Sequence, residues 1–256
     1  MLGFEDNRPL TEVIPAKQAR AIEKHLNIST CGELLRHYPR RYLHYGTGAD
    51  LTGVEAGDTI TVIGEVVDAN TFYTKKTPKR PITKVMIHDG RTEFQATFFG
   101  SQYAQRVLKP GRRAMLTGKL DFYRNQPQLQ HPDFVLMDGP TEATGSMRQL
   151  SHFGDLEEML RGRQWLPLYP ASKQVSTWTI MGAVHAVLKS LPRIDEPLGF
   201  TPIGLLPLNA AVRQIHEPGA EGPARAKERL KYDEALSVAL AMGVRCLLYT
   251  SDAADD

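Results

Sequence analysis

Two adjacent phenylalanines, Phe98 and Phe99, end a strand-like run that begins at Glu93 and is followed by a turn at Gly100. Successive side chains of a strand point to opposite faces, so Phe98 and Phe99 cannot both enter one core. The pattern predicts that Phe98 packs inside and that Phe99 is exposed. An exposed aromatic ring near basic residues is a group that proteins use to stack on unpaired bases.

Further aromatic and basic residues follow this pair. Tyr103 comes four residues after Phe99, which is about one turn if a helix begins at Gly100 or Ser101. Phe99 and Tyr103 could flank one binding spot, or both could fill the end of a barrel beneath the helix, and the sequence leaves both alternatives open. The candidates for contacts with nucleic-acid phosphates are Arg106, Arg112, Arg113, Lys119, Lys75, Lys76 and Arg80.

Enzyme and metal signatures give no comparable signal. Gly118-Lys119 superficially resembles a phosphate loop, but Leu120 replaces the Ser or Thr that would hold magnesium. The 8 histidines show no paired spacing, and Cys31 and Cys246 lie far apart, so neither a zinc site nor a disulfide framework is indicated. We therefore expect no catalytic centre, metal or cofactor in this chain itself.

Composition and charge favour a soluble protein with a basic middle section. The chain has 41% hydrophobic and 23% charged residues, and no apolar stretch approaches the ~18 residues of a membrane span. Residues 59–138 carry 12 Lys and Arg against 7 Asp and Glu, although the whole chain has a formal net charge of only +2. This local excess indicates a phosphate-binding surface, or simply a solvated face. The acidic start without an apolar run predicts no signal peptide and a cytoplasmic location.

Short strands separated by turn residues occupy the middle of the chain, with one short helix expected over Ser101–Leu108 between the third and fourth strands. Gly64 inside the first strand indicates a bulge or a sharp bend. This order is that of an OB-fold, a small barrel whose strands and loops bind oligonucleotides or oligosaccharides. The five strands are expected at Thr59–Asp68, Thr83–His88, Glu93–Phe99, Arg113–Leu120 and Gln128–Leu136.

Helices are expected on both sides of this barrel. A helix over Pro15–Leu26 and a capping-box pattern at Thr30 indicate a helical start, while the proline-rich 166–170 predicts no regular element. Another helix is expected to begin near Pro223. The predicted fold class is α+β with a mainly β core, a five-stranded OB-fold barrel flanked by N-terminal helices and a C-terminal helical connector. The expected segments are 1–50 (helical), 51–138 (barrel), 139–222 (linker and connecting helix), 223–245 (helix leading to a motor) and 246–256 (tail).

The chain resembles the N-terminal part of the RecG family of ATP-dependent DNA helicases, in its actinobacterial form. The resemblance extends from Pro9 to about Val244, and it rests on short segments whose order and spacing are specific as a set. These segments are 32–42 (GELLRHYPRRY), 97–100 (TFFG), 110–112 with 118–119, 131–134 (HPDF), 168–170 (LYP), 215–218 (IHEP) and 228–236 (ERLKYDEAL).

The resemblance implies that the barrel is a wedge domain, which splits a DNA fork by stacking aromatic residues where the arms part. The match falls on Phe98 and Phe99, with Tyr103 as the second stacking residue, and strand parity favours Phe99 within the pair. It also implies a full-length parent that unwinds forks and Holliday junctions in DNA repair and recombination, using ATP and Mg²⁺ in a motor that is absent here. For this fragment alone we expect no ATPase activity. Residues 246–256 do not resemble the family, and we expect them to be an adapter-like artefact.

The expected partner is branched DNA, bound by a monomer that does not contact membranes, with single-strand-binding protein as a further candidate partner. Two other classes of function stay open. A stand-alone single-stranded nucleic-acid-binding OB-fold protein would prefer single strands over junctions. A protein-interaction module with the same barrel would show no salt-dependent binding of DNA.

Overall fold

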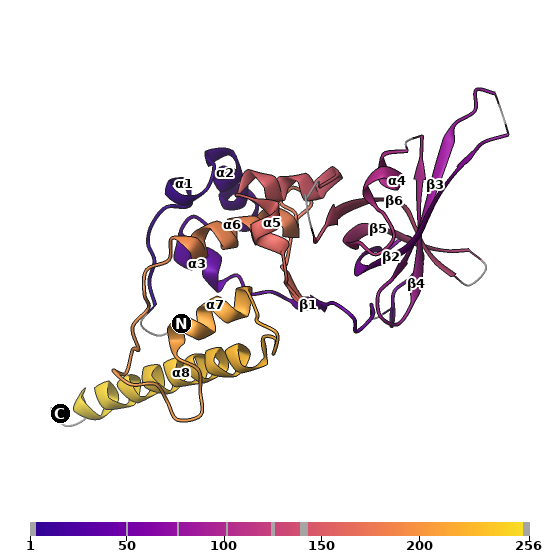
Figure 1. Ribbon diagram of the computed structural model, residues 1–256. Helices are drawn as coiled ribbons and strands as arrows, with labels where there is room; N and C mark the ends of the chain where they lie inside the picture. The colour runs from indigo at the N-terminus through magenta and orange to yellow at the C-terminus, as the bar shows by residue number, and fades with distance from the viewer. Residues whose placement is uncertain are drawn as a thin grey trace. The chain divides into compact units, whose positions relative to one another are not determined.

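The computed structural model describes residues 4–49, 51–75, 77–100, 102–123, 126–138 and 143–252 (Figure 1). The chain divides into two compact units. The helical unit consists of Met1–Arg40, Tyr169–Val175 and Val184–Asp256, and the barrel unit of Arg41–Leu168 and Ser176–Ala183. Because three separate stretches assemble the helical unit, this division differs from the predicted linear segments, whose limits stay predictions.

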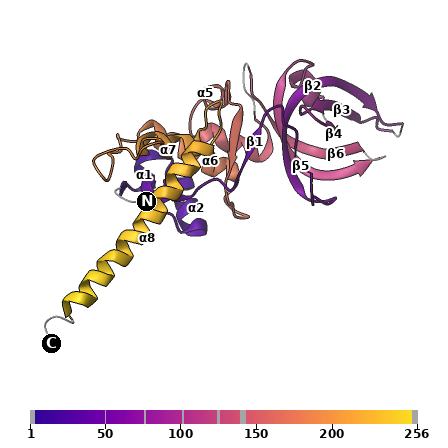
Figure 2. The same cartoon turned by 90° about the horizontal axis from the view of Figure 1, so that it is seen from below.

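Among the residues that the structure describes, five helices lie within the helical unit, and a further helix, α6 (Thr177–Lys189), begins in the barrel unit and ends in this one. The five are α1 (Leu10–Val13), α2 (Ala16–Leu26), α3 (Cys31–Arg36), α7 (Leu208–His216) and α8 (Ala224–Asp252). The second half of α8 extends beyond α7 as a single rod (Figure 2). Among the described residues, no helix combines the length and the apolar character that a bilayer crossing requires.

The predicted capping box at the start of α3 is confirmed. Thr30 Oγ1 accepts a hydrogen bond from the backbone N–H of Glu33, and the Glu33 carboxylate accepts one from the N–H of Thr30, at 3.2 and 3.0 Å. The backbone N–H of Ser29 also donates to this carboxylate and is the main cause of its lowered pKa. The two reciprocal bonds satisfy donors that the first turn of a helix leaves without partners.

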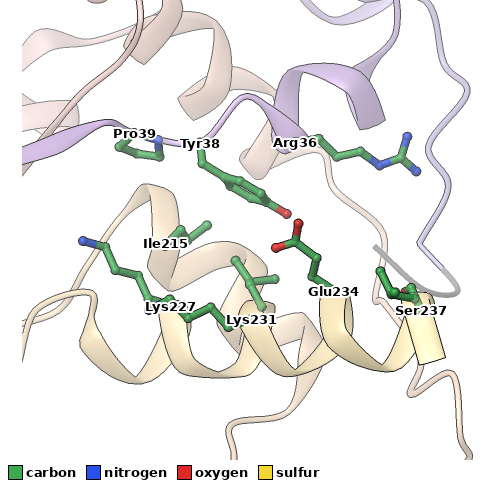
Figure 3. Close-up of a pocket in the computed structure, with 10 residues that line it drawn as sticks. Arg36, Tyr38, Pro39, Ile215, Lys227, Lys231, Glu234 and Ser237 are labelled. Carbon is green, nitrogen blue, oxygen red and sulfur yellow. The ribbon is translucent and has the colours of Figure 1, made fainter.

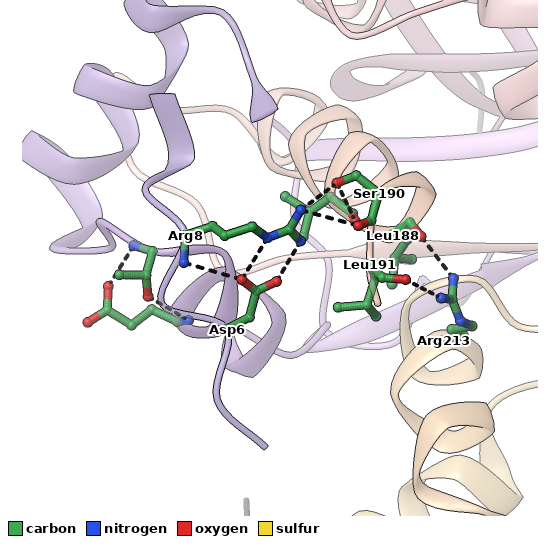
Figure 4. Close-up of polar contacts among 9 residues, drawn as sticks. Asp6, Arg8, Leu188, Ser190, Leu191 and Arg213 are labelled. Atoms are coloured by element: carbon green, nitrogen blue, oxygen red, sulfur yellow. Dashed lines mark hydrogen bonds and ion pairs between the residues drawn. The ribbon is translucent and has the colours of Figure 1, made fainter. Parts of the chain in front are cut away.

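Two arginines of the helical unit bind the residues that end α6 and follow it (Figure 4). Arg8 forms a 2.7 Å ion pair with Asp6, whose pKa it lowers, and donates to the carbonyl of Ser190. Arg213 of α7 donates to the carbonyls of Leu188 and Leu191 at 2.8 and 2.9 Å. A cation at these carbonyls satisfies acceptors that the helix itself leaves open.

The barrel unit contains five strands that close into a barrel in the order β2-β3-β4-β6-β5. Strand β2 pairs with both β3 and β5, and only the β4–β6 pair among these five is parallel. Helix α4 (Tyr103–Val107) lies between β4 and β5 in the chain. The strands are β2 (Thr59–Tyr73), β3 (Pro81–His88), β4 (Glu93–Phe99), β5 (Arg113–Tyr123) and β6 (Gln126–Leu136).

The five predicted strands and the intervening helix are confirmed, but four strands are longer than expected: β3 and β6 each begin two residues earlier, at Pro81 and Gln126. Strand β2 continues to Tyr73 instead of Asp68, and β5 continues to Tyr123 instead of Leu120. These extensions form the arms of the β2–β3 and β5–β6 hairpins, which project from the barrel in Figure 1. Because both faces of such an arm are solvated, its sequence lacks the alternation that reveals a half-buried strand.

Two glycines allow close approaches between barrel strands. A Cβ at Gly64 would lie 2.5 Å from the carbonyl oxygen of His88, so β3 could not approach there. The predicted bulge falls two residues later, between Val66 and Asp68. A Cβ at Gly118 would meet Pro132 at 2.9 Å, and the register of β5 against β6 shifts at this glycine.

One prediction for the barrel unit is wrong. Residues 166–168, for which no regular element was expected, belong to the strand β7 (Trp165–Leu168), which pairs antiparallel with β1 (Arg41–His44). Pro167 is tolerated because β7 is an edge strand of a two-stranded sheet, where a missing N–H costs no inner ladder bond. The remaining elements of this unit are η1 (Gly145–His152) and α5 (Leu156–Leu160).

Candidate nucleic-acid interface

Phe98 and Phe99 lie on opposite sides of β4, as strand parity predicts. Phe98 is 5% exposed and meets Phe134 edge to face, with ring centres 5.7 Å apart. Phe99 is 50% exposed. The predicted assignment of Phe98 to the core and Phe99 to the surface is confirmed, while a role of either ring in DNA binding stays a prediction.

Phe99 borders a surface hollow of about 420 Å³. Its backbone N–H donates a hydrogen bond to Nδ1 of His131, over 3.3 Å. His131 has a φ of 46°, a left-handed conformation that is uncommon for a residue other than glycine. The hollow is lined by Gly57, Phe99, Lys119, Leu120, Asp121, Gln130 and His131.

The outer face of the barrel beside this hollow is polar and ordered by side-chain hydrogen bonds. Residues opposite each other in the ladders share a face, so Thr97, Gln130 and Lys119 form one cross-strand row. Gln128 donates to Thr97 Oγ1, and Gln130 to the Asp121 carboxylate, each at 2.7 Å. This arrangement presents an aromatic ring, amide groups and an ammonium group together, and all three kinds of group bind nucleic acids.

Tyr103 lies in a different environment from Phe99. It is half-buried at the start of α4, and its ring stacks on Phe134 with centres 6.1 Å apart. Tyr103 therefore packs partly on the barrel core, on the side of Phe98. The ring of Tyr103 thus packs against the core as one of the two alternatives expects, and stacking of Tyr103 on a base stays a prediction.

The predicted basic residues do not form one cluster. Lys119 borders the hollow. Arg113 lies six residues before Lys119 in β5, which is roughly 20 Å at the usual rise of a strand. Arg112 forms an ion pair with Asp138 at 3.3 Å, and the guanidinium of Arg113 lies 3.8 Å from the centre of the Tyr45 ring. Both arginines thus have partners within the barrel unit, and their contact with phosphate stays a prediction.

The other predicted cations lie on α4 and on the β2–β3 hairpin. Arg106 is exposed in the last turn of α4. Lys75 and Arg80 lie in the turn of the hairpin, which is closed by a 2.9 Å hydrogen bond from the N–H of Thr74 to the carbonyl of Arg80. Lys76 lies outside the described residues.

The sequence-based interpretation missed exposed aromatic residues on the hairpin arms. Phe72 and Tyr73 end β2, and Phe122 and Tyr123 end β5; all four are exposed. An adjacent aromatic pair directly before a polar turn was the available signal in each hairpin, because parity places one member of each pair on each face. That signal was not used, since these residues lie outside the predicted strands.

A second hollow, of about 460 Å³, lies within the helical unit beneath Tyr38 (Figure 3). The Tyr38 hydroxyl points toward the Glu234 carboxylate. Burial raises the pKa of this hydroxyl to about 12. Arg36 and Lys227 point away from this centre, toward opposite ends of the hollow. Arg36 and Lys227 therefore do not converge on a common point, as cations would in a phosphate site.

Gly118-Lys119 does not form a phosphate loop for ATP with magnesium. A phosphate loop places its Gly-Lys between a strand and a helix, whereas Gly118 and Lys119 lie inside β5, with Lys119 opposite Gln130 of β6. Within the described ranges, no group of three or more His, Cys, Asp or Glu side chains is placed to hold a metal ion.

Comparisons with known proteins identify relatives over nearly the whole chain. A family model described as the RecG wedge domain matches residues 11–144. The ATP-dependent DNA helicase RecG of Mycobacterium tuberculosis (strain H37Rv) is 34% identical over 253 residues, which cover 92% of this chain and 34% of that protein. The Mycobacterium leprae protein of the same name is 33% identical and is covered to 35%. The chain thus spans about a third of the length of the curated relatives it matches.

A solved structure shares the fold. The structure of RecG bound to a three-way DNA junction matches with a TM-score of 0.53 and 20% identity, over 93% of this chain and 31% of that one. The mixed α and β architecture with its five-stranded sheet is therefore found in a protein that was solved on a branched DNA.

Proposed function

Because the chain belongs to the RecG wedge-domain family, we propose that its barrel is an OB-fold that binds branched DNA where the strands part. The observation that carries the proposal is the position of Phe99, half-exposed at the end of β4 beside a hollow that contains Lys119. The closed five-stranded barrel, with α4 between its third and fourth strands in the chain, supports the OB-fold assignment.

In this proposal, Phe99 stacks on the base that has lost its neighbour at the branch point. Such a base offers a free π-face, which is missing along an intact duplex, and stacking on an aromatic residue contributes about 1–3 kcal/mol. Lys119 binds a phosphate next to that base, and Gln130 offers donor and acceptor groups in the same hollow. Phe99 provides the preference for branches, and Lys119 provides salt-sensitive affinity.

We further propose that the full-length protein remodels branched DNA in repair and recombination, with ATP and magnesium bound outside the residues described in this structure. The printed names of the relatives, ATP-dependent DNA helicase, support the activity. Gly118-Lys119 lies inside a strand ladder rather than in a phosphate loop, which supports an ATP site outside the described residues. Purified chain is expected to hydrolyse no ATP with or without junction DNA, and turnover above a blank would contradict this assignment.

The binding proposal is tested by titrating the chain with a labelled three-way junction, a linear duplex and a single strand of matched length. We expect the junction to bind most tightly, with an affinity that falls as salt rises. Tighter binding of the single strand would favour a single-strand-binding protein, and no salt-dependent binding would favour a protein-interaction module.

Three further expectations belong to this proposal. The chain is expected to bind DNA as a monomer, which light scattering of the complex measures. Single-strand-binding protein is the candidate protein partner, and co-sedimentation with the purified chain tests it. A cytoplasmic location is expected for a protein that acts on chromosomal DNA.

A further inference from the structure

Three apolar residues from neighbouring strands form an exposed row on the outer face of the barrel. In the ladders, Phe72 lies opposite Ile82, and Ile82 lies opposite Phe99, so the three side chains share one face. Phe72 is 56% exposed, and Ile82 is half-buried between the two aromatic residues. With neighbouring strands ~4.8 Å apart, the row extends roughly 10 Å from Phe99 onto the β2–β3 hairpin.

The hairpin segment that carries Phe72 and Ile82 is cationic, whereas the hollow beside Phe99 contains Asp121 as well as Lys119. Residues 69–84 contain five Lys and Arg and no Asp or Glu. Lys84 is exposed two residues from Ile82 on the same strand, and therefore on the same face as the row. Lys79 and Arg80 are exposed in the turn of the hairpin. Apolar side chains bordered by the cations of this hairpin are complementary to a strand of bases with a phosphate backbone.

We propose that the row Phe72–Ile82–Phe99 and the cations of the β2–β3 hairpin bind the single-stranded arm that leaves the branch point. This inference rests on the proposed function, because it takes Phe99 as the contact at the branch itself. Phe72 then stacks on a base further along the same DNA strand. Ile82 fills the space between Phe72 and Phe99. Lys84, Lys79 and Arg80 bind the phosphates of that arm.

The opposite face of the hairpin is engaged within the barrel unit. Thr71 and Thr83 share a hydrogen bond of 2.8 Å, and Thr83 lies opposite the buried Phe98. The hydroxyl of Tyr73 accepts a hydrogen bond from the side chain of Gln102, next to α4. Phe72 is therefore the aromatic residue of this arm that shares the face of Phe99.

The test compares two labelled three-way junctions that differ in one arm, which is either duplex or single-stranded over about eight nucleotides, within the site size of one OB-fold. Phe72→Ala is expected to weaken binding of the junction with the single-stranded arm by about 5- to 150-fold. It should leave binding of the all-duplex junction within about twofold. Phe200→Ala, which removes an exposed ring from the helical unit, serves as the matched control and should change neither affinity.

Equal losses on the two junctions, or no loss on the single-stranded arm, would overturn the inference. Phe99→Ala, measured on the same pair, separates this outcome from failure of the proposed function. If Phe99→Ala weakens both junctions while Phe72→Ala weakens neither, the branch contact stands and the arm contact is rejected. If Phe99→Ala leaves both unchanged, the proposed function itself fails. Urea midpoints of each variant verify that these exposed substitutions leave the fold intact.

Discussion

The backbone N–H of Phe99 donates a hydrogen bond to Nδ1 of His131, over 3.3 Å, from the last residue of β4 to the β6 strand. The same imidazole meets the Phe98 ring edge to face at 6.0 Å. His131 thus contacts both members of the aromatic pair, and it fixes the backbone from which Phe99 projects. In the proposed function, His131 is therefore a positioning residue for Phe99.

This role predicts different outcomes for two substitutions at His131. Glycine accepts the φ of 46° but has no acceptor, so His131→Gly should weaken junction binding by about 2- to 12-fold, the equivalent of one neutral hydrogen bond. Asparagine tolerates the same φ and carries an oxygen near the position of Nδ1, so His131→Asn should stay within about twofold. Equal losses for both variants would show that the hydrogen bond does not matter for binding.

Phe98 and Phe99 should separate stability from binding. Phe98→Ala empties a site in the barrel core and should lower the free energy of unfolding by about 3–5 kcal/mol, measured by urea denaturation. Phe99→Ala removes a half-exposed ring and should change that free energy by less than about 0.5 kcal/mol. A large loss of stability with Phe99→Ala would instead assign this ring a packing role.

Lys119→Gln should reduce the salt dependence of DNA binding. Removing one phosphate contact lowers the slope of log K against log salt by about 0.7–0.9, measured by fluorescence anisotropy between 50 and 200 mM salt. Arg112→Gln is the comparison, since Arg112 is already paired with Asp138. A slope left unchanged by Arg112→Gln would remove Arg112 from the predicted phosphate contacts, and one left unchanged by Lys119→Gln would contradict the site.

Acid should destabilise the helical unit through His216. Nε2 donates to the carbonyl of Leu35 and Nδ1 accepts from the Tyr169 hydroxyl, each at 3.0 Å, while burial lowers the pKa of this imidazole to about 4. Between its unfolded pKa of about 6.5 and 4, the unfolded chain binds more protons than the folded one. The free energy of unfolding should therefore fall as the pH decreases through this window, by up to roughly 3 kcal/mol.

His216→Gln removes this titration and is the control for other acid-sensitive groups. Urea midpoints at pH 7 and pH 4.5 should differ less in His216→Gln than in the unaltered chain. The same difference in both proteins would show that His216 is not the group responsible.

Arg229 of α8 should hold the segment that precedes α7 against α8. Its guanidinium is 1% exposed and pairs with Glu196 and Asp233, at 2.8 and 3.2 Å. Arg229→Met leaves two carboxylates without their cation and should cost about 3–5 kcal/mol of unfolding free energy, measured with urea. A neutral result would mean that both carboxylates become solvated or protonated at little cost.

Local patterns predicted much of the barrel but little of its long-range pairing. The sequence pattern of β4 predicted the bounds of this strand. It also predicted the sides of Phe98 and Phe99, because parity is a local property of a strand. The partner of Arg112 is Asp138, 26 residues away in the sequence, and no local pattern predicts this ion pair. Tyr103 was ambiguous for a similar reason, since its contact with Phe134 depends on how α4 closes over the barrel.

The hairpin arms were missed because their strand structure comes from pairing rather than from burial. Phe72 and Tyr123 occupy positions solvated enough that apolar and polar residues do not alternate around them. The β7 strand was missed because Pro167 breaks the usual composition of a strand, although an edge position tolerates it.

The most direct test of the account is the affinity of Phe99→Ala for a three-way junction and for a linear duplex of equal length, measured side by side at one salt concentration. Base stacking at the branch predicts a loss of about 5- to 150-fold on the junction and less than about twofold on the duplex. Equal losses on both DNAs, or none on the junction, would contradict the assignment of Phe99 to the branch point.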